Sequence, residues 1–296
     1  MGTTPVYLLV TTSAFFWGAN FVLAGPVLAD VPPLWAAALR FMLGAAMMAA
    51  IAGLRKENLL ILLRRHAGTY LLLGAVGITA FNLLFFSAMR LTSADNAALI
   101  MATNPLLTTL LAAMLLGERP SARHLAALPV ALAGVAVVIA QGDIGHLASL
   151  QVNRGDLLML AANGSWALYN VLSRRYMPRG SPLGNTALIM LMGAAMLLGV
   201  ALGSGARLEP IGMEAGLALA VMAVGGTVLA YLFWSIGIMH LGAARTAIFL
   251  NLVPVSAMLV GAGFGTLPTM TQLAGGALVL GGVTVAMLPK RRLAGV

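Results

Sequence analysis

The sequence predicts an all-α membrane protein whose ten transmembrane helices form two inverted five-helix repeats, with both termini cytoplasmic. Hydrophobic residues make up 60% of the chain and charged residues 8%, a balance that soluble globular domains do not show. The apolar stretches are roughly 20 residues long, enough to cross a bilayer core of about 30 Å. The same series of aromatic, small and proline positions also occurs twice, half a chain apart.

The duplication is visible in an aromatic segment and in the proline that follows it. The segment 84–87 reads Leu-Phe-Phe-Ser, and the segment 232–235, which lies 148 residues later, reads Leu-Phe-Trp-Ser. Pro105 and Pro254 are 149 residues apart. The duplication predicts three parts: a first repeat over 1–140, a linker over 141–154 and a second repeat over 155–296.

Each repeat supplies five apolar segments that are long enough to span a membrane. Most connections between them are very short, which makes neighbouring helices antiparallel. Longer connections are expected at 54–66 and 141–154. The expected helices cover residues 4–24, 33–53, 67–89, 94–116, 122–140, 155–174, 183–203, 213–238, 243–264 and 270–288.

The basic residues predict how the helices are oriented. With the N-terminus inside, the inner loops and the C-terminal tail hold 13 Lys and Arg residues and the outer loops hold 3. Such an excess marks the cytoplasmic side, so the linker 141–154 is expected in the periplasm or outside the cell. Because each repeat has an odd number of helices, the second repeat is inverted. This is a transporter architecture, with its substrate site expected near the midplane.

Composition argues against several other classes of protein. The formal charge of +9 does not indicate a nucleic-acid partner, because the basic residues lie in short loops where they orient membrane helices. The chain has no cysteine, which excludes a thiol nucleophile or a thiolate metal site. No hydrolase motif is present, so neither an enzyme nor a cofactor or metal is expected. A channel would need a continuous pore with rings of charge or carbonyls, and matched prolines in inverted repeats favour a carrier.

Six of the expected helices carry polar and aromatic residues on one face, and we expect these faces to line one central cavity. The spacing of Ser13, Trp17 and Asn20 puts them on one side of a helix. The alternative for a single Asn or Thr is a bond between neighbouring helices, worth about 0.6 kcal/mol. For Trp17 and Trp234 the alternative is the lipid interface. The expected substrate-binding residues on these faces are Trp17, Asn20, Thr79, Asn82, Phe86, Asn104, Trp166, Asn170, Tyr231, Trp234 and Asn251.

Three further residues are unusual for membrane helices. Arg40 lies about a third of the way along its helix, where a charge is costly. It is a candidate ligand for a substrate carboxylate, and the alternatives are snorkelling to the surface or a bond to a backbone carbonyl. Pro105 and Pro254 each remove a backbone hydrogen bond inside a helix. Their matched positions predict paired hinges, with static kinks as the alternative.

The second, fifth, seventh and tenth helices have few polar residues and are expected to serve in packing. The fifth contains Ala127 and Ala131, and the tenth contains Ala277 and Gly281. Small residues four apart let helix backbones approach closely. The same residues on the fifth and tenth helices are also candidates for a homo-oligomer interface.

Several motifs together resemble the drug/metabolite transporter superfamily and, within it, the EamA branch. They are Phe16-Trp17-Gly18-Ala19-Asn20-Phe21, Asn104-Pro105 with Gly117-Glu118-Arg119-Pro120, and Gly155-Asp156-Leu157-Leu158 before Ser165-Trp166-Ala167. The resemblance covers nearly the whole chain and implies ten helices in inverted repeats and export of amino acids or other metabolites. The chain looks most like the aromatic amino acid exporters of that branch. It departs from internal symmetry at Thr266-Leu267-Pro268, where the first repeat has Glu118-Arg119-Pro120.

The acidic residues and histidines all fall in loops or at the ends of the expected helices. No proton relay is therefore expected, and a cationic substrate would lack a buried counter-charge. The prediction is a multi-pass protein of the inner or plasma membrane. We expect it to export small neutral or zwitterionic metabolites, aromatic or hydrophobic amino acids first, by uniport or exchange through alternating access. The alternative is a general metabolite, drug or nucleotide-sugar carrier of the same superfamily.

Overall fold

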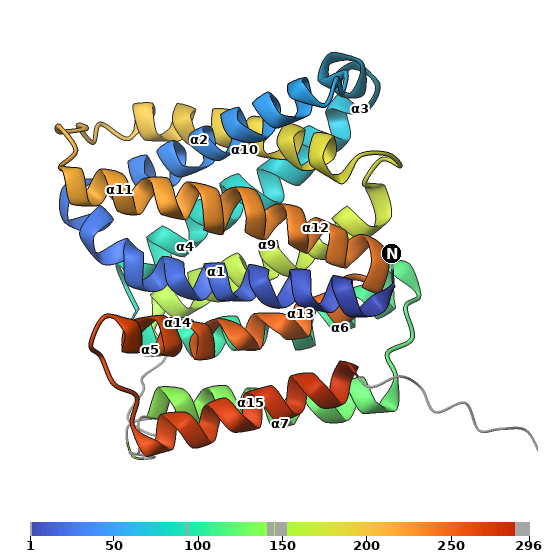
Figure 1. The fold of residues 1–296 in the computed structure, drawn as a ribbon, viewed down its shortest axis with the longest axis vertical. Coiled ribbons are helices and arrows are strands. Elements are labelled where there is room, and N and C mark those ends of the chain that lie inside the picture. Colours follow the sequence, from blue (N-terminus) through green and yellow to red (C-terminus); the bar gives the residue numbers. More distant parts are fainter. Residues whose placement is uncertain (1, 93, 141–144, 146–152, 288–296) are drawn as a thin grey trace, which may run out of the picture.

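The structure, a computed structural model, describes residues 2–92, 94–140, 145 and 153–287. These residues form helices and the turns that connect them, without a strand (Figure 1). In the first repeat the helices are α1 (Thr3–Asp30), α2 (Pro33–Leu54), α3 (Leu59–Gly74), η1 (Ala75–Ala80), α4 (Phe81–Met89), α5 (Ala94–Ala102), α6 (Asn104–Leu116) and α7 (Ala122–Ala140). In the second they are α9 (Arg154–Tyr176), α10 (Pro182–Gly203), α11 (Met213–Val221), η2 (Met222–Leu229), α12 (Ala230–Leu241), α13 (Ala243–Ala247), η3 (Ile248–Asn251), α14 (Leu252–Gly263) and α15 (Met270–Met287).

Ten membrane-length helical segments are present among the described residues, as predicted. Nine are apolar enough to count as spans by composition alone. The tenth is α9, whose 23 residues include charges only near its two ends. At its start, Asn153 and Asp156 form a capping box, in which each side chain accepts a hydrogen bond from the other residue's backbone. The charges therefore mark where this segment begins and ends and do not interrupt it.

The expected long connection at 54–66 is wrong, because α3 already begins at Leu59. The Asn58 side chain caps this helix by accepting a hydrogen bond from the backbone N–H of Ile61, at 3.0 Å. The helix continues through two arginines, which are good helix formers, and bends at His66, where φ is −133°. Basic residues therefore gave a false signal for a loop here.

The helices lie in layers, with two helix pairs at the edges and the remaining helices between them (Figure 1). One edge pair is α2 with α10, and the other is α7 with α15. Each pair joins one helix from each repeat, which confirms the packing role expected for these four helices. The start of α1 and the end of α15 lie at the same end of the bundle (Figure 1), where the Tyr7 hydroxyl donates a hydrogen bond to the carbonyl of Met287 at 3.4 Å.

Small residues allow α7 and α15 to pack closely. A Cβ added at Gly134 would lie 2.7 Å from the backbone nitrogen of Val279, and one added at Gly282 would lie 2.9 Å from that of Ala131. Ala127 and Ala131 are buried in this contact, as predicted, but Ala277 and Gly281 are exposed. The packing prediction for those two residues is wrong, because α15 presents the face of Gly275 and Gly282 to α7. Self-association through α7 and α15 stays a prediction.

Helices of the two repeats are broken and widened at equivalent places. The fourth segment is interrupted at Thr103, between α5 and α6, and Pro105 is the second residue of α6. The ninth segment passes through the short 3₁₀ helix η3 just before Pro254. The third and eighth segments contain the π-helices η1 and η2, in which Thr79 and Thr227 are 148 residues apart. π-helical turns often occur at functional sites.

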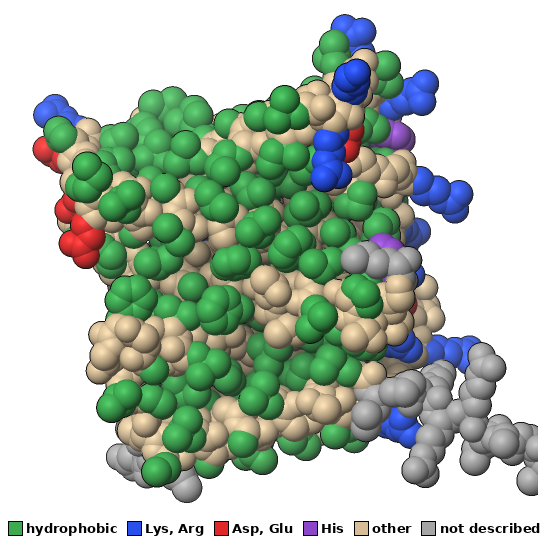
Figure 2. Space-filling view, in the orientation of Figure 1, with side chains coloured by type: hydrophobic (Ala, Val, Ile, Leu, Met, Phe, Trp, Pro, Cys, Tyr) green, Lys and Arg blue, Asp and Glu red, His purple; other side chains and the backbone are tan. Residues whose placement is uncertain are grey.

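Charged residues gather at the two ends of the bundle, with a broad apolar surface between them (Figure 2). One end, called here the arginine-rich end, carries Arg55, Lys56, Arg64, Arg65, Arg119, Arg174, Arg175, Arg179 and Arg245. The opposite end carries Asp30, Glu209 and Glu214 together with Arg207. The cytoplasmic location of the arginine-rich end stays a prediction from the excess of basic residues.

Candidate functional site

An aromatic cluster occupies the centre of the bundle, where helices of both repeats meet. Trp17 of α1 packs against Trp166, Tyr231 and Trp234, with ring centroids 5.4, 5.7 and 4.9 Å apart. Such contacts between rings add stability beyond the area that they bury. Four residues predicted separately from the sequence are thus brought together. The name aromatic cluster is used for Trp17, Phe41, Phe81, Trp166, Tyr169, Tyr231 and Trp234.

Trp17 is held in place by the π-helix η2. Its indole N–H donates a hydrogen bond to the backbone carbonyl of Gly226, at 2.9 Å. One turn earlier the Ser13 hydroxyl donates to the carbonyl of Ala230, at 2.9 Å, and one turn later Asn20 lies against Gly226. The predicted common face of Ser13, Trp17 and Asn20 is therefore real, and it faces the eighth membrane segment. A widened helix leaves carbonyls free to accept such bonds.

Trp234 is fully buried, which excludes the lipid interface that was the alternative for this residue. Its indole N–H donates to the Asn170 side-chain oxygen, at 2.8 Å. Asn170 is itself fully buried in α9, one helical turn after Trp166. This bond holds Trp234 of α12 against α9. It uses the side-chain oxygen of Asn170 and leaves the amide nitrogen of Asn170 without a partner among the described residues.

Three buried nitrogen donors around the aromatic cluster have no hydrogen-bond partner among the described residues. They are Arg40 Nε, Trp166 Nε1 and Asn170 Nδ2. The Arg40 guanidinium lies 4.9 Å from the ring centroid of Phe41, which in turn contacts Tyr231 at 5.5 Å. Buried donors normally have acceptors. Since none of the three atoms can accept a hydrogen bond, they suit a ligand that supplies oxygen acceptors.

Asn104 and Asn163 belong to a second polar group, which supports the break in the fourth membrane segment. The Asn104 amide nitrogen donates to the Asn163 side-chain oxygen at 2.5 Å. The Asn163 amide nitrogen donates to the carbonyl of Ile100 at 2.8 Å and to the Thr103 hydroxyl at 2.9 Å. Thr108 then donates to the Asn104 side-chain oxygen. These bonds satisfy polar groups at the interruption before Pro105, as broken membrane helices require.

The other predicted residues lie at the widened and broken segments. Thr79 donates its hydroxyl hydrogen toward the carbonyls of Gly193 and Gly74, at 3.2 and 3.4 Å. Asn82 donates to the carbonyl of Ile78 at 2.6 Å. Phe86 is half-buried and packs against Phe85. Asn251 is buried at the break of the ninth segment, and its side-chain oxygen has no partner among the described residues.

Sequence reasoning missed three rings of the aromatic cluster and two glycines against which aromatic rings pack. Phe41, Phe81 and Tyr169 were not among the predicted residues. A Cβ at Gly77 would collide with the Tyr169 ring, and a Cβ at Gly225 would lie 2.7 Å from the Phe16 ring. These glycines are 148 residues apart, so each repeat has a glycine at this position. That recurrence in the sequence could have indicated that an aromatic ring packs directly against the backbone there.

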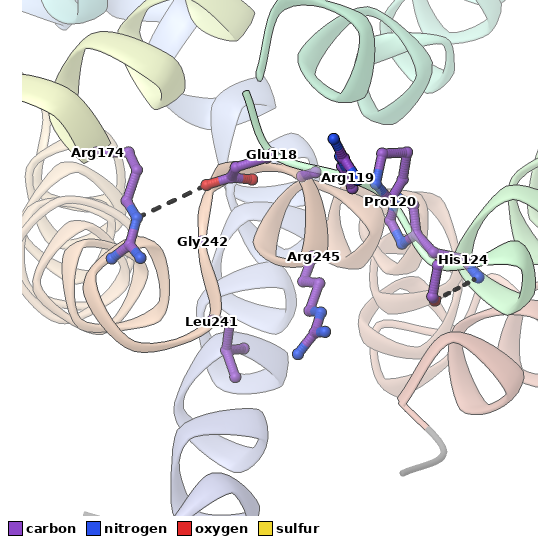
Figure 3. A pocket seen from close by; sticks show the side chains of 10 residues that line it. Glu118, Arg119, Pro120, His124, Arg174, Leu241, Gly242 and Arg245 are labelled. Carbon is purple, nitrogen blue, oxygen red and sulfur yellow. Dashed lines mark hydrogen bonds and ion pairs between the residues drawn. The ribbon is translucent and has the colours of Figure 1, made fainter. Parts of the chain in front are cut away.

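A cavity of about 270 Å³ lies at the arginine-rich end (Figure 3). On one side of it, Glu118 Oε1 lies 3.6 Å from Arg174 Nε. A second cavity, of about 250 Å³, lies beside the connection between α14 and α15. The first is lined by Glu118, Arg119, Pro120, Ser121, His124, Arg174, Leu241, Gly242, Ala244 and Arg245. The second is lined by Val22, Ala257, Met258, Gly261, Phe264, Thr266, Leu267, Pro268 and Gln272.

A duplicated bundle of broken helices around a shared central cluster is the architecture of a membrane transporter. Comparison with known protein families leads to the same class of protein. The EamA-like transporter family matches residues 4–140 and 153–288, and the chain belongs to this family. It is a multi-pass membrane transporter and not an enzyme.

Individual relatives extend over the whole length of the chain. The uncharacterized transporter YyaM of Bacillus subtilis is 38% identical over 95% of this chain and 93% of its own. The aromatic amino acid exporter YddG of Ancylobacter novellus is 29% identical over 99% of this chain and 100% of its own. One solved crystal structure has a TM-score of 0.83 to this fold, with 26% identity and 99% coverage of both chains.

Proposed function

We propose that this transporter exports small neutral or zwitterionic metabolites, with aromatic or hydrophobic amino acids as the main substrates. The observation that carries the proposal is the aromatic cluster with its three unpartnered nitrogen donors, Arg40 Nε, Trp166 Nε1 and Asn170 Nδ2. Aromatic rings provide a surface for an apolar side chain. Donors without acceptors suit a carboxylate, which accepts several hydrogen bonds at once.

The substrate site is proposed at the boundary between the repeats. Trp17 and Arg40 belong to the first repeat, and Trp166, Tyr231 and Trp234 belong to the second. Any rocking of one repeat against the other therefore changes the spacing of these residues, as alternating access requires. The proposed site residues are Trp17, Asn20, Arg40, Thr79, Asn82, Phe86, Asn104, Trp166, Asn170, Tyr231, Trp234 and Asn251, with Pro105 and Pro254 as hinges.

Transport without a proton relay is proposed from the positions of the carboxylates. Asp30 accepts a hydrogen bond from the backbone N–H of Gly212 at 3.0 Å, just before α11. Glu57 accepts from the Ser181 hydroxyl at 2.6 Å, just before α10. Asp156 is part of the capping box of α9. These carboxylates serve the ends of helices, where negative charge is favourable. We therefore propose uniport or exchange down the gradient of the substrate.

Counterflow in proteoliposomes tests the proposal. Liposomes loaded with unlabelled phenylalanine are placed in labelled phenylalanine, with and without an imposed pH gradient. Transient accumulation that is independent of the gradient is expected. A strict requirement for the gradient would contradict the uncoupled mechanism. Absence of counterflow with phenylalanine, tryptophan or leucine would contradict the substrate class and favour another metabolite or a nucleotide sugar.

Trp17→Ala provides the test of the site itself. The substitution removes contacts with three rings, each worth about 0.5–1.5 kcal/mol. The lost ring is also part of the surface proposed for the substrate, and a loss of about 1.4 kcal/mol in substrate binding would lower counterflow by roughly tenfold. The matched control is Phe15→Ala, because Phe15 is an aromatic residue two positions away in α1 but is exposed on the surface. Equal losses in the two variants would contradict the proposed site.

A further inference from the structure

We propose that Glu118 and Arg174 form a clasp that closes the arginine-rich end of the transport pathway. The clasp has to separate before substrate can enter from that end. This inference rests on the alternating-access part of the proposed function and not on the choice of substrate. It assigns a role to two charged residues outside the aromatic cluster.

The first arm of the clasp comes from the first repeat. Gly117 ends α6 in the left-handed conformation, with φ of 65°, and Glu118 follows it. The Glu118 carboxylate lies 3.6 Å from Arg174 Nε (Figure 3). It also lies against Gly242, the residue between α12 and α13, where an added Cβ would be 2.9 Å from Glu118 Oε1. Gly242 has φ of 89°, so both its conformation and its lack of a side chain admit the carboxylate.

The second arm is Arg174, in the last turn of α9. Its Nη1 donates hydrogen bonds to the carbonyls of Met239 and Ile238, at 2.5 and 3.4 Å. These carbonyls belong to the last residues of α12, where a cation is favourable. Arg174 therefore contacts the end of α12 on one side and Glu118 on the other. Together the pair connects α6 of the first repeat with α9 and α12 of the second.

Solvent access to the pair suits a contact that opens and closes. The side chains of Arg174 and Glu118 are 40% and 26% exposed. Water can therefore replace each partner when they separate, and neither charge is left buried without compensation. A fully buried pair would resist separation, whereas this one lies on the wall of the cavity at the arginine-rich end.

The equivalent position in the second repeat shows that the fold does not require these charges. At a separation of 148 residues, Glu118 corresponds to Thr266 and Arg119 corresponds to Leu267. The orientation of membrane proteins explains why arginines gather at one end, but it does not explain a carboxylate among them. Glu118 therefore has a role of its own, and its contacts indicate that this role is to join the repeats.

Cysteine labelling measures the clasp directly, because the natural chain has no cysteine. The reporter is Ala244→Cys, at a residue that lines the cavity and is 5% exposed. The protein is placed in lipid nanodiscs, where both ends are accessible, and is treated with a membrane-impermeant maleimide. Glu118→Gln should raise the labelling rate by at least about threefold, because losing the ion pair shifts the population toward the open state.

Two further variants keep the result interpretable. Glu57→Gln is the matched control, since Glu57 is another carboxylate at this end, bonded to the Ser181 hydroxyl; its labelling rate should stay at that of the reporter alone. In an Arg174→Gln background, Glu118→Gln should raise the labelling rate no further, because its partner in the ion pair is already absent. An unchanged rate in Glu118→Gln, an equal increase in Glu57→Gln, or a further increase of the same size in the Arg174→Gln background would each overturn the clasp. The readout needs no substrate, so it stands apart from a failure of the counterflow experiment.

Discussion

Two cavities lie at equivalent positions of the two repeats, one lined mainly by charged and polar side chains and the other mainly by apolar ones. In the first repeat, the connection after α6 and the start of α7 place Glu118, Arg119 and His124 around a cavity of about 270 Å³. In the second, the connection after α14 and the start of α15 place Thr266, Leu267 and Gln272 around a cavity of about 250 Å³. The duplicated backbone thus encloses a similar space at both places. The side chains that line it have diverged.

The two repeats have kept the same backbone features and differ in the side chains that make contacts at their ends. The π-helices η1 and η2 and the helix breaks before the prolines recur in both repeats, because they are features of the backbone. Among the described residues, the ion pair of Glu118 with Arg174 has no counterpart at the equivalent position of the second repeat, where Thr266 replaces the glutamate. Alternating access can use a symmetric backbone that is closed by different side chains at its two ends. In that case, substitutions of backbone features should have similar effects in the two repeats, and substitutions of contacting side chains should have different effects.

The largest effect is expected at the glycines of the two π-helices. In Gly77→Val the new side chain would collide with the Tyr169 ring, and in Gly225→Val it would meet the Phe16 ring. Each should destabilise the protein by about 1–3 kcal/mol or more, because close-packed cores resist added volume. Thermal unfolding in detergent measures both. Gly164→Val is the control, since an added Cβ there meets nothing within 4 Å. If Gly225→Val destabilised the protein and Gly77→Val did not, the proposed equivalence of the two π-helices would be contradicted.

A smaller and unequal effect is expected at the two helix breaks. Asn104→Ala removes hydrogen bonds with Asn163 and Thr108 and should cost about 1–3 kcal/mol, because buried partners are left unsatisfied. Asn251→Ala should cost less, since the Asn251 side-chain oxygen has no partner among the described residues. Unfolding temperatures of the two variants provide the comparison. Equal destabilisation would show that the second break depends on its asparagine as much as the first.

The sequence predicted the fold well because its signals are long and repeated. Apolar length located the membrane segments, and an odd number of helices per repeat implied inversion. The segment around α3 was misplaced because Arg64 and Arg65 resembled a loop, although a helix whose residues are exposed at the end of the bundle can carry them. Charge content alone does not end a helix.

The site was predicted in part, and the limit has a physical cause. Trp17 and Trp166 differ strongly from their apolar neighbours, so helical spacing was enough to place each on a face. Phe41 and Phe81 lie in helices with few polar residues, where one more hydrophobic ring carries little directional signal. The same limit applies to Ala277 and Gly281, which are small residues on the exposed face of α15. Which face of an apolar helix packs inward depends on its partner.

The smallest effect on stability is expected at the clasp itself. Glu118→Gln should lower the free energy of unfolding by no more than about 1 kcal/mol, because ion pairs this exposed are largely screened by water and salt. The same variant should change labelling of the cavity at the arginine-rich end several-fold. Thr266→Val, the equivalent substitution in the second repeat, should change neither quantity. A large loss of stability in Glu118→Gln would mean that Glu118 serves to hold the fold together, and the difference between the two ends would then concern packing and not gating.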